Sequence, residues 1–221
     1  TPLLNLGDTL GAMVVAYIFL HLFWFFGVNG GSVVGAVFNP ILQTLSAVNI
    51  AGEHHIICQQ FQDLFATFGG AGSTLSLVIA MLLFCKSKRI TNLGNLSFVP
   101  GIFGINEPIL FGAPIVLNPM FFIPFVICGG IIGSLGGWAM YLGIMKCSTF
   151  TPPYVGVFLV GFLTNMDPMS IVVNAVQLIL SILIWYPFVK SYEKTYGNKE
   201  EETNAISAED AAILDDLDLD F

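Results

Sequence analysis

Charged residues are scarce in this sequence. They make up 10% of the 221 residues, whereas about a quarter of the residues in a soluble globular domain are charged. Hydrophobic residues make up 55%. This composition excludes an ordinary soluble domain and indicates a protein embedded in a membrane.

Acidic residues are also rare outside the C-terminus. Residues 1–189 contain only Asp8, Glu53, Asp63, Glu107 and Asp167, and the other ten acids follow Lys190. The net charge of −8 therefore describes residues 190–221, which we expect to form a cytoplasmic tail that is disordered or helical. It indicates no nucleic-acid partner for residues 1–189, the expected membrane-embedded domain.

Cysteine pairs, metal-ligand clusters and a signal peptide are missing. The four cysteines are far apart and form no CxxC pair, which argues against disulfide and zinc sites. No basic stretch followed by a short apolar run and a cleavage site opens the chain, so its start at Thr1 resembles a domain boundary. We expect no metal and no cofactor.

Long apolar runs predict transmembrane helices. About 20 apolar residues are needed to cross the hydrocarbon core of a bilayer, and residues 10–28, 64–85, 118–145 and 171–189 meet this length. Lys86, Lys88 and Arg89 follow the second run, and Trp185 and Tyr186 close the last one as interfacial anchors. By the positive-inside bias, we expect these ends to be cytoplasmic.

Two other apolar stretches are too interrupted by glycine, proline and asparagine to span. Residues 30–49 and 98–116 predict re-entrant hairpins, which are tolerated at membrane depth only where they are buried in protein or line a cavity. The predicted fold is an all-α integral membrane protein with transmembrane helices and two re-entrant hairpins. Broken helices of this kind mark the binding sites of transporters.

Glu107 is the main functional candidate, because an acid inside an apolar, glycine-broken segment is costly unless it is paired or faces water. The alternative is that it only caps a half-helix beginning near Pro108, and both interpretations can hold together. Pro108 disfavours helical dihedrals at Glu107, so we expect an extended turn that displays its carboxylate and the Asn106 amide to a polyhydroxylated ligand.

Two further positions are less specific. Asn29 ends the first predicted helix, where a left-handed cap explains it at least as well as a function does. His54 and His55 lie in a loop beside Glu53, and a loop histidine has a functional role only in a minority of cases.

The run GINEPILFG at residues 104–112, followed by PIVLNP at 114–119, resembles the signature of a known family. This is the lactose, cellobiose and diacetylchitobiose family of phosphotransferase-system membrane subunits, called EIIC. LFWFFGVNG at 22–30, His55 with Ile56, and FGGAGSTL at 68–75 support the resemblance in the same order. It covers nearly the whole chain up to the acidic tail.

The resemblance implies the sugar-binding, C-terminal half of a multi-pass subunit in the bacterial plasma membrane. The absent first half would form most of a homodimer contact. Such a subunit binds and translocates a β-linked disaccharide, which a phosphocysteine on a soluble IIB subunit, itself served by IIA, phosphorylates on the cytoplasmic side. Because the donor lies on IIB, the resemblance leaves open whether this chain is itself an enzyme.

The resemblance also implies a set of site residues. Glu107 would bind sugar hydroxyls and accept the proton of the attacking one, with Asn106 and Pro108 beside it, and His55 matches a histidine of many relatives. Asn29, followed by Gly30, stands where many relatives have a histidine that contacts the sugar. An asparagine can bond a hydroxyl but cannot act as a base at neutral pH.

Two other function classes remain open. An ion-coupled secondary sugar transporter would use Glu107 as a carboxylate that gains and loses a proton. An intramembrane enzyme would need a nucleophile with a base or a metal set, and no such set is visible in the sequence.

Overall fold

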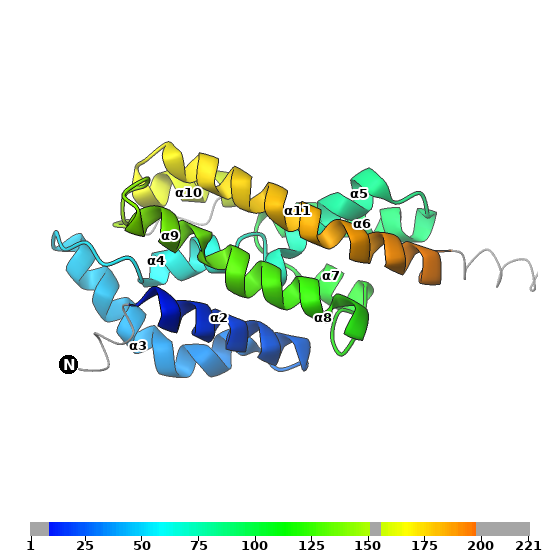
Figure 1. Cartoon of the computed structure of the whole chain (residues 1–221), viewed down its shortest axis with the longest axis horizontal. Coiled ribbons are helices and arrows are strands. Elements are labelled where there is room, and N and C mark those ends of the chain that lie inside the picture. The colour runs from blue at the N-terminus through cyan, green and yellow to red at the C-terminus, as the bar shows by residue number, and fades with distance from the viewer. Residues whose placement is uncertain (1–8, 151–155, 198–221) are drawn as a thin grey trace, which may run out of the picture.

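The computed structural model describes residues 9–150 and 156–197 and shows an elongated body in which these residues form helices and connecting loops (Figure 1). In chain order the elements are α2 (Leu10–Phe25), α3 (Gly30–Ile50), α4 (Gln59–Phe61), η1 (Gln62–Ala66), η2 (Ala71–Ser73), α5 (Thr74–Phe84), α6 (Lys88–Ile102), α7 (Glu107–Gly112), α8 (Pro119–Val126), η3 (Ile127–Ile131), η4 (Ile132–Ser134), α9 (Leu135–Tyr141), α10 (Val157–Asn165) and α11 (Met169–Tyr196).

Three stretches of helix are long and apolar enough to cross a membrane. They are α3 with 21 residues, the stretch Pro119–Tyr141 from α8 to α9 with 23, and α11 with 28. The last two confirm the spans predicted at 118–145 and 171–189. The predicted run 10–28 forms the shorter helix α2 of 16 residues, and Gly27 then turns the chain with a φ of 80°.

The re-entrant hairpin predicted at residues 30–49 is wrong, because these residues form the single helix α3. Asn29 caps its N-terminus by accepting a hydrogen bond from the Ser32 N–H at 2.9 Å, so the glycine pair begins the helix instead of breaking it. Pro40 removes one backbone donor, a loss that a membrane helix tolerates. The left-handed cap considered for Asn29 lies at Gly27 instead, since Asn29 has a φ of −63°.

The continuous span predicted at residues 64–85 is also wrong, because this part of the chain is broken in the middle. α4 and the π-helical η1 precede the break, and α5 follows it towards the other end of the body. Gly69, Gly70 and Gly72 have φ values of 66°, 93° and 71°. Residues with a side chain rarely adopt such values, so the glycines set the position of the break.

The interruption predicted at residues 98–116 is confirmed. α6 ends at Ile102, the chain turns over residues 103–106, and the short helix α7 returns beside α6. α5 packs against both of these helices. We call residues 103–106 the α6–α7 tip.

A second turned-back segment joins α9 to α10. The N–H groups of Thr149 and Phe150 donate to the Thr164 carbonyl at 3.2 and 3.3 Å, so these two residues lie beside the end of α10. Gly156, which precedes α10, lies against Ile102 at the end of α6. Of the two predicted hairpins, only the one at residues 98–116 is thus confirmed, and this segment was not among them.

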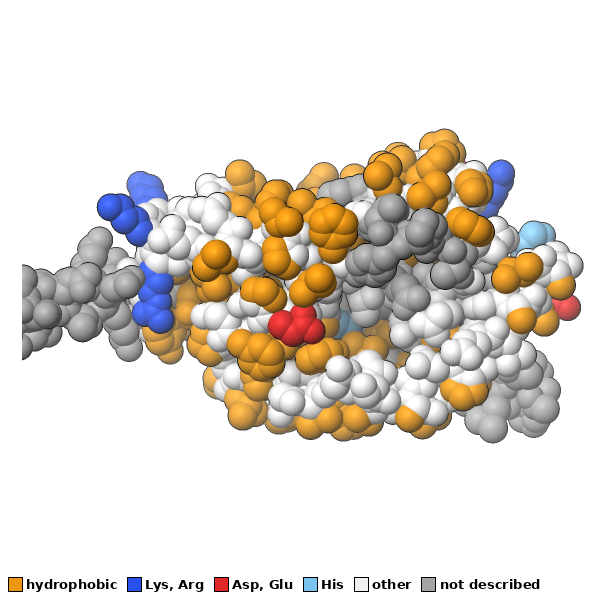
Figure 2. Space-filling view, turned by 180° about the vertical axis from the view of Figure 1, so that it is seen from behind, with side chains coloured by type: hydrophobic (Ala, Val, Ile, Leu, Met, Phe, Trp, Pro, Cys, Tyr) orange, Lys and Arg blue, Asp and Glu red, His pale blue; other side chains and the backbone are white. Residues whose placement is uncertain are grey.

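The two ends of the body differ in charge. Lys86, Lys88 and Arg89 at the α5–α6 turn and Lys190 and Lys194 in α11 form what we call the basic end. Figure 2 shows apolar side chains over much of the surface and basic side chains gathered mainly at one end. The opposite end carries the α3–α4 loop and the α10–α11 turn.

The C-terminal part of α11 is bound to the α5–α6 turn. The Glu193 carboxylate accepts hydrogen bonds from the backbone N–H groups of Lys86 and Ser87, the latter at 3.0 Å. Lys190 Nζ pairs with Glu193 and donates to the Phe84 carbonyl at 2.9 Å. α11 continues through Lys190 to Tyr196, and the predicted acidic tail beyond residue 197 lies outside the described residues.

Substitution of Gly72 tests the broken span. A Cβ atom at Gly72 would lie 2.2 Å from the Phe125 ring, so we expect Gly72→Ala to lower the free energy of unfolding by about 2 kcal/mol or more. Gly11→Ala is the control, because Gly11 in α2 has open space around its Cβ position. Thermal unfolding of the full-length protein in detergent measures both, and equal midpoints would contradict the assigned break.

The α10–α11 turn gives a pH prediction. Hydrogen bonds from the backbone N–H groups of Met169 and Lys146 to the Asp167 carboxylate hold the pKa of Asp167 below its usual value of 3.8. A lowered pKa means that the ionised form stabilises the fold above pH 3.8 and that this contribution is lost as the pH falls further. Asp167→Asn should therefore destabilise the turn at pH 7 and have a smaller effect at pH 3, measured by amide exchange at Met169.

Candidate functional site

The α6–α7 tip is closed by a regular helix-ending motif. The Ile105 N–H donates to the Pro100 carbonyl and the Gly104 N–H to the Gly101 carbonyl, both at 3.0 Å. This pairing requires a left-handed residue, and Gly104 supplies it with a φ of 75°. The glycine of the GINEP run is thus needed to turn the chain directly before Asn106 and Glu107.

Asn106 fixes the tip against the break in the preceding span. Its side chain is buried, and Nδ2 lies 3.4 Å from the Ala71 carbonyl oxygen. Gly70 lies against the same side chain, with only 2.6 Å between its Cβ position and the Asn106 Cβ. Asn106 therefore joins the two interrupted segments of the fold.

Three ring systems hold the other side of the break. The Trp185 indole N–H donates to the Gly72 carbonyl at 3.2 Å. Phe125 packs on Gly72, and its ring centroid lies 5.6 Å from that of His21 in an edge-to-face arrangement. His21 is fully buried, with Nδ1 2.6 Å from the Tyr17 carbonyl oxygen. The break is therefore held by side chains from α2, α8 and α11.

Glu107 is the first residue of α7 and is exposed at the surface of the described chain. The extended turn expected at Glu107 is wrong, because the residue already belongs to the helix, with Pro108 next to it in the first turn. A carboxylate at this position is favoured by the free N–H groups of the helix start. The capping interpretation is not supported, because Asn106 holds the N-cap position of α7 and no side chain forms a cap hydrogen bond there, but the Glu107 side chain is accessible.

Asn29 and Gly30 lie at the start of α3, directly after the turn from α2. Asn29 is exposed and uses Oδ1 to cap α3. Gly30 is buried, and a Cβ atom there would lie 1.9 Å from the Leu20 carbonyl oxygen. The Leu117 N–H donates to the Phe25 carbonyl at 2.9 Å, which ties this turn to the connection that follows α7.

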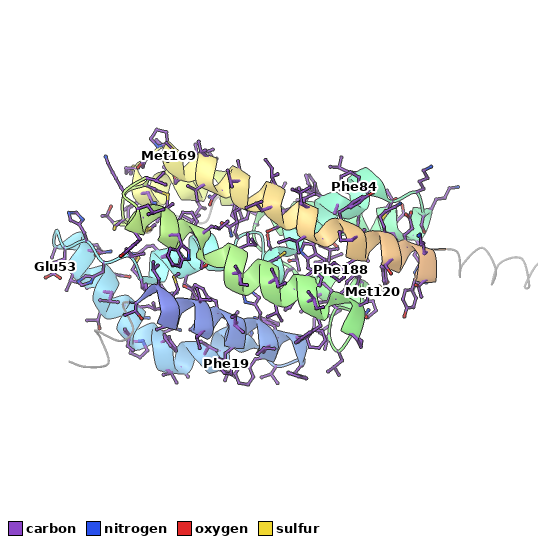
Figure 3. All side chains as sticks on the ribbon, viewed as in Figure 1. Phe19, Glu53, Phe84, Met120, Met169 and Phe188 are labelled. Carbon is purple, nitrogen blue, oxygen red and sulfur yellow. The ribbon has the colours of Figure 1, made fainter. Side chains whose placement is uncertain are left out.

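His55 lies away from the tip. Its Nε2 is 2.8 Å from the Glu53 carboxylate, and its backbone N–H donates to Asn49 at 2.7 Å. Figure 3 places Glu53 at one extremity of the body, whereas α7 lies in the other half (Figure 1). The structure thus brings Asn106, Glu107 and Pro108 together and leaves His55 apart. Within the described ranges, no cluster of three or more His, Cys, Asp or Glu side chains has metal-binding geometry.

Sequence reasoning missed the role of α11 in this site. Trp185 was assigned to the membrane interface, but its side chain is fully buried beneath the break, whereas Tyr186 is 43% exposed. Gln177 lies on the same face and donates to the Phe65 carbonyl at 2.7 Å. The sequence does contain a signal for this role, because residues that can form hydrogen bonds recur at helical spacing along the apolar run. In the structure they form one buried stripe of α11, which consists of Ser170, Asn174, Gln177, Ser181 and Trp185.

Interrupted helices that meet inside an apolar helical body, with an amide and an acid at the break, are typical of membrane transport proteins. The model of the family described as "Phosphotransferase system, EIIC" matches residues 2–129. The chain belongs to this family.

Individual relatives agree with this assignment. The chain is 34% identical over 210 residues to the oligo-beta-mannoside-specific EIIC component of Bacillus subtilis, covering 91% of this chain and 48% of that one. It is 32% identical over 223 residues to the lactose-specific EIICB component of Lacticaseibacillus casei, covering 97% and 38%.

A solved structure shows the same fold. The transporter ChbC, the IIC component of an N,N'-diacetylchitobiose-specific phosphotransferase system, superimposes with a TM-score of 0.84 at 34% identity. The match covers 90% of this chain and 48% of ChbC. The chain thus spans about half the length of these relatives, or less.

The bond from Trp185 to Gly72 can be tested together with Asn106, because both side chains hold adjacent carbonyls of one turn. We expect Trp185→Phe to lower the free energy of unfolding by about 1–3 kcal/mol, since it leaves the Gly72 carbonyl without its donor. Combined with Asn106→Ala, the two effects should be non-additive by at least about 0.5 kcal/mol.

Trp138→Phe is the matched control for this cycle, because Trp138 is 46% exposed. Trp138→Phe should change the free energy of unfolding by no more than about 0.5 kcal/mol. Chemical unfolding of the full-length protein in detergent measures all the variants. Strict additivity of Trp185→Phe and Asn106→Ala would show that the two side chains do not act on a common turn.

Proposed function

We propose that this chain is the sugar-binding half of a phosphotransferase-system membrane subunit that binds and translocates a β-linked disaccharide. The observation that carries this proposal is the α6–α7 tip, where Asn106 is fixed by the break and Glu107 is displayed beside it. Relatives named for oligo-β-mannosides, cellobiose and lactose take β-linked sugars, which supports this substrate class.

In this proposal the candidate site residues have distinct roles. Glu107 accepts hydrogen bonds from sugar hydroxyls, and Pro108 starts the half-helix that presents it. Asn106 positions the tip through the Ala71 carbonyl. Asn29 donates a hydrogen bond from its Nδ2 amide to a sugar hydroxyl, and Gly30 lets the start of α3 pack closely against α2. His55 binds a sugar hydroxyl only when the α3–α4 loop approaches the sugar.

The proposed membrane arrangement follows from the charges. The basic end faces the cytoplasm by the positive-inside bias, and the protein is multi-pass in the bacterial plasma membrane. The remaining half of the subunit would supply the homodimer contact. The soluble partners are IIB and IIA subunits, and the fused EIICB relatives support a IIB partner.

The chemistry then requires no phosphoryl donor in this chain. The phosphoryl group passes from the cysteine sulfur of IIB to a sugar hydroxyl oxygen. The S–P bond breaks, the O–P bond forms, the sulfur leaves as thiolate, and the hydroxyl proton goes to the Glu107 carboxylate. Glu107 is suited to this role because it is exposed and not consumed by an ion pair among the described residues.

Glu107→Gln tests this proposal in membranes that contain the full-length subunit, its soluble partners and phosphoenolpyruvate. Loss of the carboxylate should lower the rate of sugar phosphorylation about 100-fold or more, with cellobiose, lactose and diacetylchitobiose each assayed as substrate. The control is Glu200→Gln, which removes a carboxylate from the C-terminal region and should leave the rate of sugar phosphorylation unchanged.

The same assay distinguishes group translocation from ion-coupled secondary transport. Group translocation yields phosphorylated sugar only when phosphoenolpyruvate and the partners are present. Accumulation of unmodified sugar driven by a proton gradient, without phosphoenolpyruvate, would replace this proposal by the ion-coupled secondary transporter.

A further inference from the structure

A groove opens between the base of the α6–α7 hairpin and the last turns of α11. Its volume is about 310 Å³, and its lining includes Arg89, Asn92, Leu96, Gly112, Tyr192 and Tyr196. The two tyrosine rings lie side by side with centroids 4.9 Å apart. The groove thus combines an apolar floor with an arginine, an amide and phenol groups, all of which can donate hydrogen bonds.

The charge of this region is strongly positive. Arg89 is exposed and has no carboxylate partner among the described residues. Glu193, the acid of this end within the described ranges, is occupied by Lys190 and by the backbone N–H groups of Lys86 and Ser87. Within residues 9–150 and 156–197 the guanidinium of Arg89 is therefore available to an anion, and its planar donors match the oxygens of a phosphoryl group.

The groove also lies on the half-helix that carries the proposed sugar site. Gly112, which lines the groove, is the last residue of α7, and Glu107 is the first. At 1.5 Å per residue, the two lie about 8 Å apart along the helix axis. An anion in the groove would therefore approach the tip from the basic end.

We propose that this groove docks the phosphorylated IIB subunit and that Arg89 pairs with its phosphoryl group. The proposal rests on the proposed function and adds the docking surface and its key residue. The bond between Glu193 and the α5–α6 turn keeps the two walls of the groove together, because it ties α11 to the start of α6. Arg89 thereby acts on the donor side of the reaction, and Glu107 on the sugar side.

The test uses the full-length subunit in vesicles with phosphorylated IIB at varied concentration. Arg89→Gln should raise the KM for phosphorylated IIB about tenfold or more, since it removes a charge-assisted pair. Arg89→Lys should give a smaller increase, because a lysine keeps the charge but not the paired donors. Sugar affinity, measured without IIB, should stay within about twofold of the parent protein.

The matched control is Lys146→Gln, which removes an exposed cation at the opposite end of the body. It should leave the KM for phosphorylated IIB unchanged. Raised salt should increase the KM of the parent protein more than that of Arg89→Gln, because salt screens the proposed pair.

Two outcomes would overturn the proposal. One is an unchanged KM in Arg89→Gln, and the other is a change that occurs in vesicles of anionic lipid but not in vesicles of zwitterionic lipid, which would assign the groove to a lipid headgroup. Either result leaves the proposed function intact if the parent protein still forms phosphorylated sugar. Failure of the parent protein to do so would instead refute the proposed function.

Discussion

The structure depends on one constraint, which is that backbone carbonyls freed by a broken helix must find donors inside an apolar body. The break after η1 frees the carbonyls of Phe65, Ala71 and Gly72. Gln177 and Trp185 from α11 and Asn106 from the α6–α7 tip supply the donors. The polar stripe of α11 and the position of the tip both follow from this requirement.

The same requirement links the candidate site to distant parts of the chain. Trp185 donates to Gly72, the neighbour of the residue whose carbonyl holds Asn106. Phe125 fills the space beside Gly72, where no side chain fits, and His21 packs against the Phe125 ring. The display of Glu107 is thus supported by α2, α8 and α11, although none of these helices carries a group expected to react.

The sequence predicted those features that depend on local composition. The spans in α8–α9 and α11 follow from long apolar runs, and the interruption before Glu107 follows from closely spaced prolines and glycines. The segments at residues 30–31 and 69–72 are both rich in glycine, but the first begins a helix and the second interrupts one. Asn29 precedes the first pair and caps a helix, whereas the second group takes positive φ values. Hydropathy does not distinguish these cases.

Tertiary position was not predictable from single residues. Trp185 and Tyr186 before a lysine have the composition of an interfacial pair, but the partner of Trp185 is 113 residues away in the sequence. Likewise, the placement of His55 beside Glu53 is set by Asn49 in the preceding helix. Such contacts are decided by the assembled fold and not by sequence neighbours.

The attachment of α11 to the α5–α6 turn also bears on how this region can diverge. Glu193 accepts from main-chain N–H groups at positions 86 and 87, and every residue except proline offers that donor. Mutations at those two positions therefore keep the backbone hydrogen bonds to Glu193, whereas a mutation of Glu193 itself removes their acceptor. The Ser87 hydroxyl also donates to the Gly197 carbonyl at 3.0 Å, so of the two turn positions it is Lys86 whose side chain can vary most freely.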